Sequence, residues 1–211
     1  MYDKIFDEVA KEYDNWYETH YKIFLCEKEA IKKLSLQGLG LEVGIGTGSI
    51  ASELGIKLGI DPSLPMLFLA KEKGIDVVRG FGEILPFKNE IFDFVLISTT
   101  LCFVGDRISL MKEVHRVLKR KGKAAVCFIP RDSAWGRYYI EKGEQGHRIY
   151  RHARFLSFGE IIELLETPGF VIKKIVSTLR FSPEGEPILE RPIEGIANGG
   201  FVCLEAEKKE I

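Results

Sequence analysis

Apolar side chains recur along the middle of the chain in two alternating patterns. Short apolar runs, typical of strands, cover residues 39–43, 57–60, 75–78, 92–98 and 124–129. The segments between some of these runs carry apolar residues at helical intervals and predict helices at 48–54, 63–73 and 108–118. Strands that are apolar almost throughout and alternate with helices are typical of a parallel sheet with both faces covered. The pattern therefore predicts a doubly wound α/β fold.

The two ends of the chain show different patterns. Residues 5–34 carry apolar side chains at helical spacing and predict two helices that separate near residues 18–21. After Pro130, a polar, aromatic and basic stretch leads to a predicted helix at 158–167. Two more strands are predicted at 170–181 and 199–207, and a long loop over 182–198 joins them. Because no strong helix lies between these strands, we expect an antiparallel end to a mostly parallel, seven-stranded sheet.

Length and composition are consistent with one domain. A chain of 211 residues with 45% hydrophobic side chains can form one sizeable core. Within a single domain over residues 1–211, we predict four consecutive parts: a helical cap at 1–36, a core at 37–130, an insert at 131–157, and a last helix with terminal strands at 158–211.

Charge and apolar content exclude some partners and locations. The formal net charge of -1 gives no overall field that would attract nucleic acid or an anionic membrane. The start of the sequence lacks the basic segment and the uninterrupted apolar segment of a signal peptide. No apolar run approaches the roughly 20 residues that cross a bilayer. We therefore expect a cytoplasmic protein without a membrane span, and the sequence leaves its oligomeric state open.

The four cysteines, Cys26, Cys102, Cys127 and Cys203, form no CxxC pair. Three of them lie in apolar, strand-like runs, where a thiol packs as a small apolar side chain. We predict that all four are reduced and structural, as is usual in the cytosol. No spacing of His, Asp and Glu residues predicts a metal site.

A glycine-rich loop follows the first predicted strand. Gly44, Gly46 and Gly48 stand directly before a predicted helix. Glycines there let the backbone turn tightly and approach a ligand, with amides at the positive end of the helix. A dinucleotide loop usually runs GxGxxG, but Ser49 occupies the place of its third glycine. The spacing therefore disfavours NAD, although glycines alone are also compatible with an ordinary turn.

An acidic residue ends the second predicted strand. Asp61 lies about twenty residues beyond the end of the first strand, where a carboxylate can accept hydrogen bonds from ribose hydroxyls. An acid at this position also repels the 2′-phosphate of NADP. Alternatively, Asp61 caps the helix that begins near Pro62, and this role is compatible with ribose binding.

These residues resemble a known family. Leu41–Gly48 is similar to motif I of class I S-adenosylmethionine-dependent methyltransferases, with Glu42 at its acidic position and Asp61 at the ribose-binding position. Blocks at 78–87, 92–95 and 115–123 resemble later blocks of the family, and residues 157–170 also fit. The best match is the small-molecule group that includes ubiquinone and menaquinone biosynthesis methyltransferases. The resemblance implies a Rossmann-like methyltransferase fold with a helical lid, and S-adenosylmethionine as the methyl donor, with S-adenosylhomocysteine as its product.

The resemblance also implies a set of cofactor-binding residues. They are Glu42, Gly44, Gly46, Gly48, Asp61, Pro62, Met66, Phe81, Gly82, Glu83, Ser98 and Thr99. The chain departs from the family at Phe81, where an Asp usually meets the adenine amino group. We therefore expect adenine to contact the backbone of Gly82 and Glu83 and to pack against Phe81 or Met66.

The methyl acceptor is expected between the amino-terminal helices and the insert, which both carry many aromatic side chains. Candidate catalytic residues are Tyr17, His20, His147 and His152, since histidine titrates near neutral pH. An equally simple interpretation is that these side chains pack on the core or lie on a solvated basic face. The segment after the fourth strand lacks the Asn or Asp followed by Pro-Pro and an aromatic residue that adenine and glutamine-amide methyltransferases carry.

The leading hypothesis is methyl transfer to O, N or C of a small molecule by in-line displacement. An RNA or protein methyltransferase is a second hypothesis, because residues 131–154 carry six Lys or Arg against three acids, a modest basic patch. A third is a non-catalytic, S-adenosylmethionine-binding regulatory domain. An NAD-dependent oxidoreductase is disfavoured by the glycine spacing.

Overall fold

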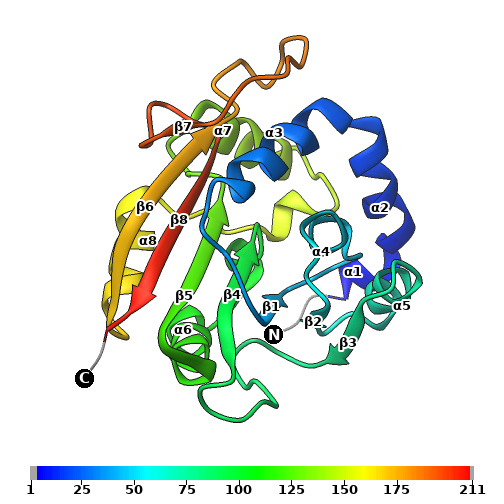
Figure 1. Cartoon of the computed structure of the whole chain (residues 1–211). Helices are drawn as coiled ribbons and strands as arrows, with labels where there is room; N and C mark the ends of the chain where they lie inside the picture. Colours follow the sequence, from blue (N-terminus) through cyan, green and yellow to red (C-terminus); the bar gives the residue numbers. More distant parts are fainter. Residues whose placement is uncertain (1–3, 210–211) are drawn as a thin grey trace.

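The computed structural model describes residues 4–209, which form an α/β structure around one sheet (Figure 1). Eight strands are arranged in the order β3-β2-β1-β4-β5-β8-β6-β7. Their bounds are β1 Gly40–Val43, β2 Leu58–Asp61, β3 Asp76–Arg79, β4 Phe92–Ser98, β5 Leu118–Phe128, β6 Phe170–Thr178, β7 Ile193–Glu194 and β8 Phe201–Lys208.

The sheet is parallel from β3 to β5 and antiparallel from β5 to β7. The pairs β1–β2, β1–β4, β2–β3 and β4–β5 are parallel. The pairs β5–β8, β6–β8 and β6–β7 are antiparallel. The predicted doubly wound fold with an antiparallel end is thus confirmed. The eighth strand, β7, lies inside the predicted loop and pairs with Val176 and Ser177 of β6. It has only two residues, which are too few to produce a strand pattern in the sequence.

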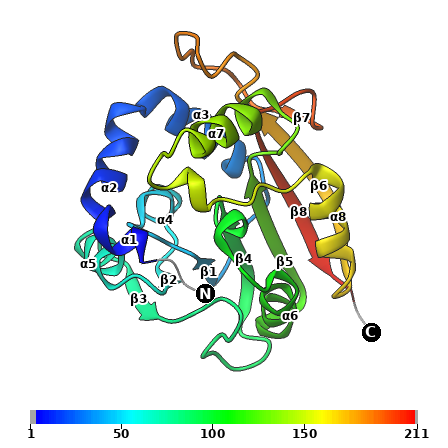
Figure 2. The same cartoon turned by 180° about the vertical axis from the view of Figure 1, so that it is seen from behind.

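Helices cover both faces of the sheet (Figures 1 and 2). The α-helices are α1 Ile5–Glu8, α2 Ala10–Thr19, α3 Tyr21–Lys32, α4 Ser49–Leu54, α5 Leu64–Glu72, α6 Arg107–Val117, α7 Ala134–Glu144 and α8 Phe158–Glu166. Two short 3₁₀ turns are η1 Leu101–Phe103 and η2 Tyr150–His152. Helices α6 and α8 pack on one face, and α3, α4 and α7 pack on the other.

The central strands contribute side chains to both cores. In β4, Val95 and Ile97 pack with α6 and α8, whereas Phe94 and Leu96 pack with α3 and α7. Neither face of β4 meets water, which explains why its sequence is apolar almost without interruption.

Three elements differ from the sequence-based expectation. The amino-terminal cap breaks at Val9 as well as near His20, which gives three helices. The insert contains α7 and η2. Strand β5 begins at Leu118, six residues before the predicted start at residue 124. Leu118 pairs with Phe92, and the register shifts after this pair. The lysines and the arginine that follow Leu118 are polar and resemble a turn in the sequence.

Cys127 and Cys203 form a disulfide. They lie directly opposite each other in the antiparallel pair β5–β8, so the ladder itself brings their side chains together. The prediction of four reduced cysteines is therefore wrong for this pair, because a long-range register cannot be read from a single strand pattern. Cys26 and Cys102 are free thiols.

The outer bounds that we predicted for the cap and the terminal segment include residues 1–3 and 210–211, which lie outside the described residues. Within residues 4–209, no helix is both long enough and apolar enough to cross a membrane.

Candidate active site

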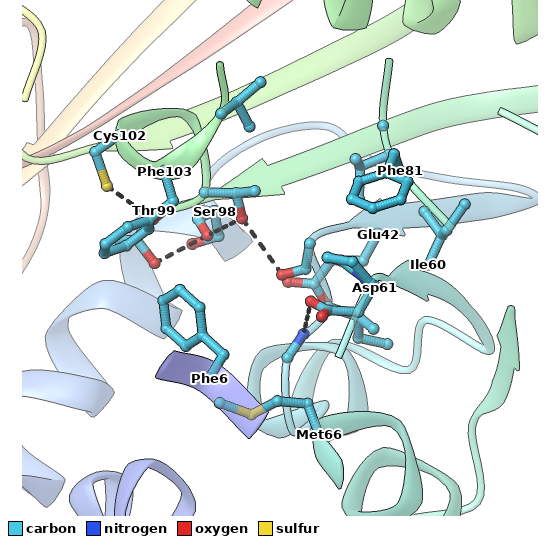
Figure 3. Close-up of a pocket in the computed structure, with 18 of the residues that line it drawn as sticks. Phe6, Glu42, Ile60, Asp61, Met66, Phe81, Ser98, Thr99, Cys102 and Phe103 are labelled. Atoms are coloured by element: carbon cyan, nitrogen blue, oxygen red, sulfur yellow. Dashed lines mark hydrogen bonds between the residues drawn. The ribbon is translucent and has the colours of Figure 1, made fainter. Parts of the chain in front are cut away.

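A cavity of about 430 Å³ lies beyond the carboxyl ends of β1, β2 and β4. This is the place where doubly wound sheets bind ligands. Residues of α1, α2 and η2 contribute to its wall opposite the sheet, and Figure 3 shows part of its lining. The cavity is therefore built from the sheet edge on one side and from the cap and the insert on the other.

The glycine loop approaches β4 closely. Gly44 has a φ of +72°, and a Cβ atom there would lie 2.2 Å from Cγ2 of Thr100. The Thr100 hydroxyl in turn donates a hydrogen bond to the Gly44 carbonyl at 3.3 Å. Only glycine fits both the backbone conformation and the contact.

Asp61 is held at the end of β2 by two backbone amides. Its Oδ2 accepts a hydrogen bond from Gly46 N at 3.0 Å, and its Oδ1 accepts one from Ser63 N at 2.8 Å. The cap of α5 is Ser63, whose hydroxyl accepts a bond from Met66 N. Asp61 thus lies beside the glycine loop and faces the cavity, and the helix cap is a different residue.

Glu42 is the most deeply buried acid of the cavity wall. Its side chain is 2% exposed, and no described residue forms a hydrogen bond with its Oε2. Burial, together with the negative charge of Asp61, raises the pKa of Glu42 to about 8. A buried carboxylate without a counter-charge favours the binding of a positively charged group.

The cavity has two ends that differ in lining. Phe81 and Ile60 lie at one end near Asp61, whereas Phe6, Thr99 and Phe103 lie at the other (Figure 3). Phe6 and Phe103 contact each other edge to face, with ring centroids 4.9 Å apart. The first end thus combines a carboxylate with apolar side chains, and the second end is largely aromatic.

All the predicted cofactor-binding residues except Gly48 line this cavity. Gly48 packs below the loop instead, where a Cβ atom would lie 2.6 Å from Cδ1 of Ile75. Its role is structural, because its φ of +74° closes the turn into α4.

Two tyrosines from α2 border the second end of the cavity. The hydroxyls of Tyr13 and Tyr17 lie 3.4 Å apart, and both side chains line the cavity. Burial raises the pKa of Tyr13 to about 12 and raises the pKa of Tyr17 well above its ordinary value. Both hydroxyls are therefore neutral at physiological pH, and the Tyr17 hydroxyl donates its hydrogen bond to the Tyr13 hydroxyl.

Of the three candidate histidines, only His152 lines the cavity, where its Nε2 accepts a hydrogen bond from Arg151 Nε at 2.9 Å. His20 is exposed at the break between α2 and α3 and stacks on Trp16. His147 is exposed and stacks on Tyr150. The structure thus does not bring His20 or His147 to the cavity.

The cap is tied to the core by charged side chains. Asp14 of α2 pairs with Lys73 and accepts a hydrogen bond from the hydroxyl of Ser49. Burial raises the pKa of Asp14, but the hydrogen bonds from Lys73 and from hydroxyls outweigh it, and the net pKa is lowered. Asp7 accepts a hydrogen bond from the Ser63 hydroxyl at 2.7 Å. These contacts hold α1 and α2 over the cavity.

Several lining residues were not predicted. Ile60 and Phe6 carry only the signal of ordinary core positions, a strand interior and a helix start. Arg154 follows the helical part of the insert, and its charge was assigned only to a general basic stretch, whereas Arg151 belongs to the aromatic and basic residues of the insert that were expected near the acceptor. Among residues 4–209, no group of three or more His, Cys, Asp or Glu side chains could hold a metal ion.

Comparisons with known proteins identify the family. A family model described as "Methyltransferase domain" matches residues 41–126. A crystal structure from Thermotoga maritima, named as a SAM-dependent methyltransferase and possible histamine N-methyltransferase, is 39% identical, covers 97% of this chain and 98% of its own, and has a TM-score of 0.92. The chain belongs to the class I S-adenosylmethionine-dependent methyltransferases.

Other relatives agree with this assignment. An uncharacterized protein of Methanocaldococcus jannaschii is 42% identical over 97% of this chain and 98% of its own length. A demethylmenaquinone methyltransferase of Corynebacterium kroppenstedtii is 31% identical over 59% of this chain and 58% of its own length. The expected relation to quinone-biosynthesis methyltransferases is thus confirmed as a distant one.

Proposed function

We propose that this methyltransferase transfers the methyl group of S-adenosylmethionine to a small molecule enclosed between the sheet edge and the cap. The observation that carries the proposal is the cavity of about 430 Å³, whose far end is lined by aromatic side chains of α1, α2 and η1. Its volume lies in the range of roughly 300–1,000 Å³ that is usual for small-molecule sites.

The lining fits the methyl donor. Glu42, buried and without a counter-charge, suits the ammonium group of its methionine part. Asp61, held by two amides, suits the ribose hydroxyls. Phe81, Ile60 and Met66 provide apolar surface for adenine, and the backbone of Gly82 and Glu83 completes that end.

S-adenosylmethionine supplies a methyl group on a positively charged sulfur, which becomes neutral when the methyl leaves. The protein gains rate by holding the acceptor in line with this group and by excluding water. Ser98 is the last residue of β4, and Thr99 follows it at the second end of the cavity, beside Phe6 and Phe103 (Figure 3). Thr99 adopts a φ of +51°, an uncommon conformation for a non-glycine residue and one that occurs often at functional sites.

Tyr17 and His152 are the remaining candidates for contact with the acceptor, since both line the cavity. His20 and His147 are not retained. Cys102 also lines the cavity, but burial raises its pKa to about 12, so its thiol is protonated and not a nucleophile at neutral pH.

An RNA acceptor fits the basic insert less well. Arg148 pairs with Glu8 and Glu12 of the cap, and Arg131 pairs with Glu160. Part of the positive charge of the insert is therefore neutralised within the protein, which weakens a phosphate-binding face.

The names of two relatives support a small-molecule acceptor, and one of these names specifies nitrogen as the acceptor atom. The Thermotoga maritima protein is named as a possible histamine N-methyltransferase, and more distant relatives are demethylmenaquinone methyltransferases. Both names describe small acceptors.

Binding and turnover test the proposal separately. S-adenosylmethionine and S-adenosylhomocysteine should raise the melting temperature, and NAD should not. Labelled methyl transfer should then be measured on panels of small amines, phenols and activated carbon acids, with RNA and protein as comparison substrates. Stabilisation by NAD alone, or transfer only to a macromolecule, would contradict it.

A further inference from the structure

The acids and the arginines that line the cavity form two separate groups. The acids, Glu42, Asp61 and Glu83, come from β1, from the end of β2 and from the segment after β3. The arginines, Arg151 and Arg154, come from η2 and from the segment that follows it. We assign the acids to the side that holds the methyl donor, so the two arginines are left without an assigned ligand.

Backbone contacts place Arg154 at the second end of the cavity. Its amide donates a hydrogen bond to the carbonyl oxygen of Cys102 at 2.7 Å. Cys102 lies beside Thr99 and Phe103 at that end (Figure 3). Arg151 stands in η2, and the segment around η2, yellow in Figures 1 and 2, lies beyond the carboxyl end of β4. Both arginines therefore reach the cavity from the insert, on the acceptor side.

The backbone of Arg154 is fixed from two sides. In addition to the hydrogen bond of its amide, its carbonyl oxygen accepts one from Nη2 of Arg107 at 3.1 Å. The Nε of Arg107 donates to the carbonyl oxygen of Leu101 at 2.7 Å. Arg107 thus binds carbonyl oxygens, and within residues 4–209 it forms no ion pair with an acid. Its positive charge therefore adds to that of Arg154 on the same side of the cavity.

Neither of the two arginines in the cavity wall pairs with an acid of residues 4–209. Arg151 donates one hydrogen bond, from Nε to Nε2 of His152 at 2.9 Å, and its Nη groups have no acceptor among these residues. The guanidinium of Arg154 has no hydrogen bond or ion pair within the same range. Arg131 and Arg148 do not line the cavity, and both pair with glutamates. The insert therefore leaves positive charge unpaired at the cavity.

The remaining lining of this end is mostly aromatic. Phe6, Tyr13, Tyr17 and Phe103 contribute rings, and the two tyrosines are neutral at physiological pH. A guanidinium binds a carboxylate or a phosphate through parallel N–H donors, and aromatic rings pack against a flat apolar ligand. This end thus combines a surface for an aromatic body with donors for an anionic group.

We propose that Arg151 and Arg154 bind an anionic group of the methyl acceptor, so that the acceptor is a small acid with a carboxylate or a phosphate on an aromatic body. The inference rests on the proposed small-molecule methyl transfer. Both arginines are exposed, and solvent screens their charge, so they select among acceptors while the aromatic rings hold the body of the molecule. A protonated amine would meet the same two charges and be repelled.

The test compares Arg151→Gln and Arg154→Gln with Arg120→Gln. Arg120 is exposed near the amino end of β5, whereas the cavity lies beyond the carboxyl ends of the strands, so this control removes an equal charge away from the site. Binding is measured by calorimetry with saturating S-adenosylhomocysteine. The ligands are phenylacetate, benzylphosphonate, 2-phenylethanol and 2-phenylethylamine, and the same four groups on 4-hydroxyphenyl and indole skeletons.

We expect at least one carboxylate or phosphonate to bind more tightly than its alcohol and its amine. Arg151→Gln and Arg154→Gln should each weaken this acid fivefold or more, and should change the affinity for the alcohol and for S-adenosylhomocysteine by less than twofold. Arg120→Gln should match the wild-type protein in all three measurements. The order of carboxylate and phosphonate shows which of the two anions the site prefers.

A second readout needs no variant. Raising the ionic strength from about 0.01 M to about 1 M shortens the Debye length from about 30 Å to about 3 Å. Because the arginines are exposed, the affinity for the acid should fall over this range, whereas the affinity for the alcohol should not.

The inference is wrong if no acid binds while S-adenosylhomocysteine does, if an amine binds best, or if both substitutions leave the affinity for the acid unchanged. It is also wrong if the substitutions weaken the alcohol as much as the acid, because the arginines would then only support the structure of the insert. A failure to bind S-adenosylmethionine and S-adenosylhomocysteine would instead contradict the proposed function itself.

Discussion

Asp61→Ala tests the placement of the ribose. The substitution removes a carboxylate that accepts hydrogen bonds from Gly46 N at 3.0 Å and from Ser63 N at 2.8 Å. In the complex, the same carboxylate would also accept bonds from the ribose hydroxyls. The variant therefore loses ligand contacts and also leaves the Gly46 amide of the glycine loop without its partner.

The magnitude follows from these contacts. Leaving buried polar partners unmet costs about 1–3 kcal/mol, which corresponds to a dissociation constant raised about 5- to 150-fold. The effect on folding should be smaller. The pKa of Asp61 is raised because burial outweighs the two amide bonds, so removing the acid also relieves a desolvation cost in the free protein.

Calorimetric titration with S-adenosylhomocysteine measures the loss, and thermal unfolding of the free variant checks its fold. Asp76→Ala is the control. Asp76 is exposed at the amino end of the neighbouring strand β3, whereas the cavity lies beyond the carboxyl ends of the strands. Equal affinity of Asp61→Ala and the wild-type protein would show that the ribose lies elsewhere.

Three further predictions concern the pH dependence, the loop and the cap. The pKa of Glu42 in the folded state is about 8, above its ordinary value of 4.5. Between these two pH values the folded protein keeps a proton that the unfolded protein releases. The stability of the protein therefore falls at this site as the pH rises from 4.5 to 8. Glu42→Gln should therefore stabilise the free protein by about 1–3 kcal/mol near pH 8 and little near pH 4.5 in thermal unfolding, and an equal effect at both pH values would contradict this. Gly44→Ala should lower the free energy of unfolding in urea clearly more than Gly55→Ala does. Gly55 has a similar φ, so both variants lose about 1–2 kcal/mol from the backbone conformation, but nothing lies within 4 Å of a Cβ atom at Gly55. Equal losses of stability would mean that the close contact between Gly44 and Thr100 does not matter. Asp14→Asn should cost about 0.5–1 kcal/mol of stability through its half-exposed pair with Lys73 and should increase proteolysis within α2; unchanged proteolysis would show that this pair does not hold the cap.

The parallel half of the fold is predictable because burial on both faces leaves a strong mark in the sequence. The predicted bounds of strand β4, Phe92–Ser98, match the structure to the residue. Its side chains point alternately to the two faces of the sheet, and helices cover both faces, so apolar residues occur on both sides of the strand. Strand β5 is not predicted in this way, because the residues that follow its first, Lys119–Lys121, are exposed and show the polarity of a turn. The sequence of a single strand does not show which other strand it pairs with.

The same distinction applies to the cavity. The loop glycines and Asp61 were predicted because their backbone role restricts the residue type at known spacings after a strand. Phe6 comes from a helix of four residues, and nothing in its sequence distinguishes a cavity-lining phenylalanine from a core one. His20 and His147 were selected by residue type alone, and residue type does not determine which side of a helix or loop faces the cavity.

The burial of Glu27 could have been predicted from its spacing along the helix, although its residue type suggests an exposed position. A glutamate is normally assigned to the exposed side of a helix, but its spacing from Phe24 and Ile31 places it on the apolar side. Glu27 and Glu42 both have pKa values raised to about 8, chiefly by burial. Each lowers the stability of the free protein at neutral pH, and a positively charged group bound beside Glu42, which lines the cavity, would offset the cost at that residue.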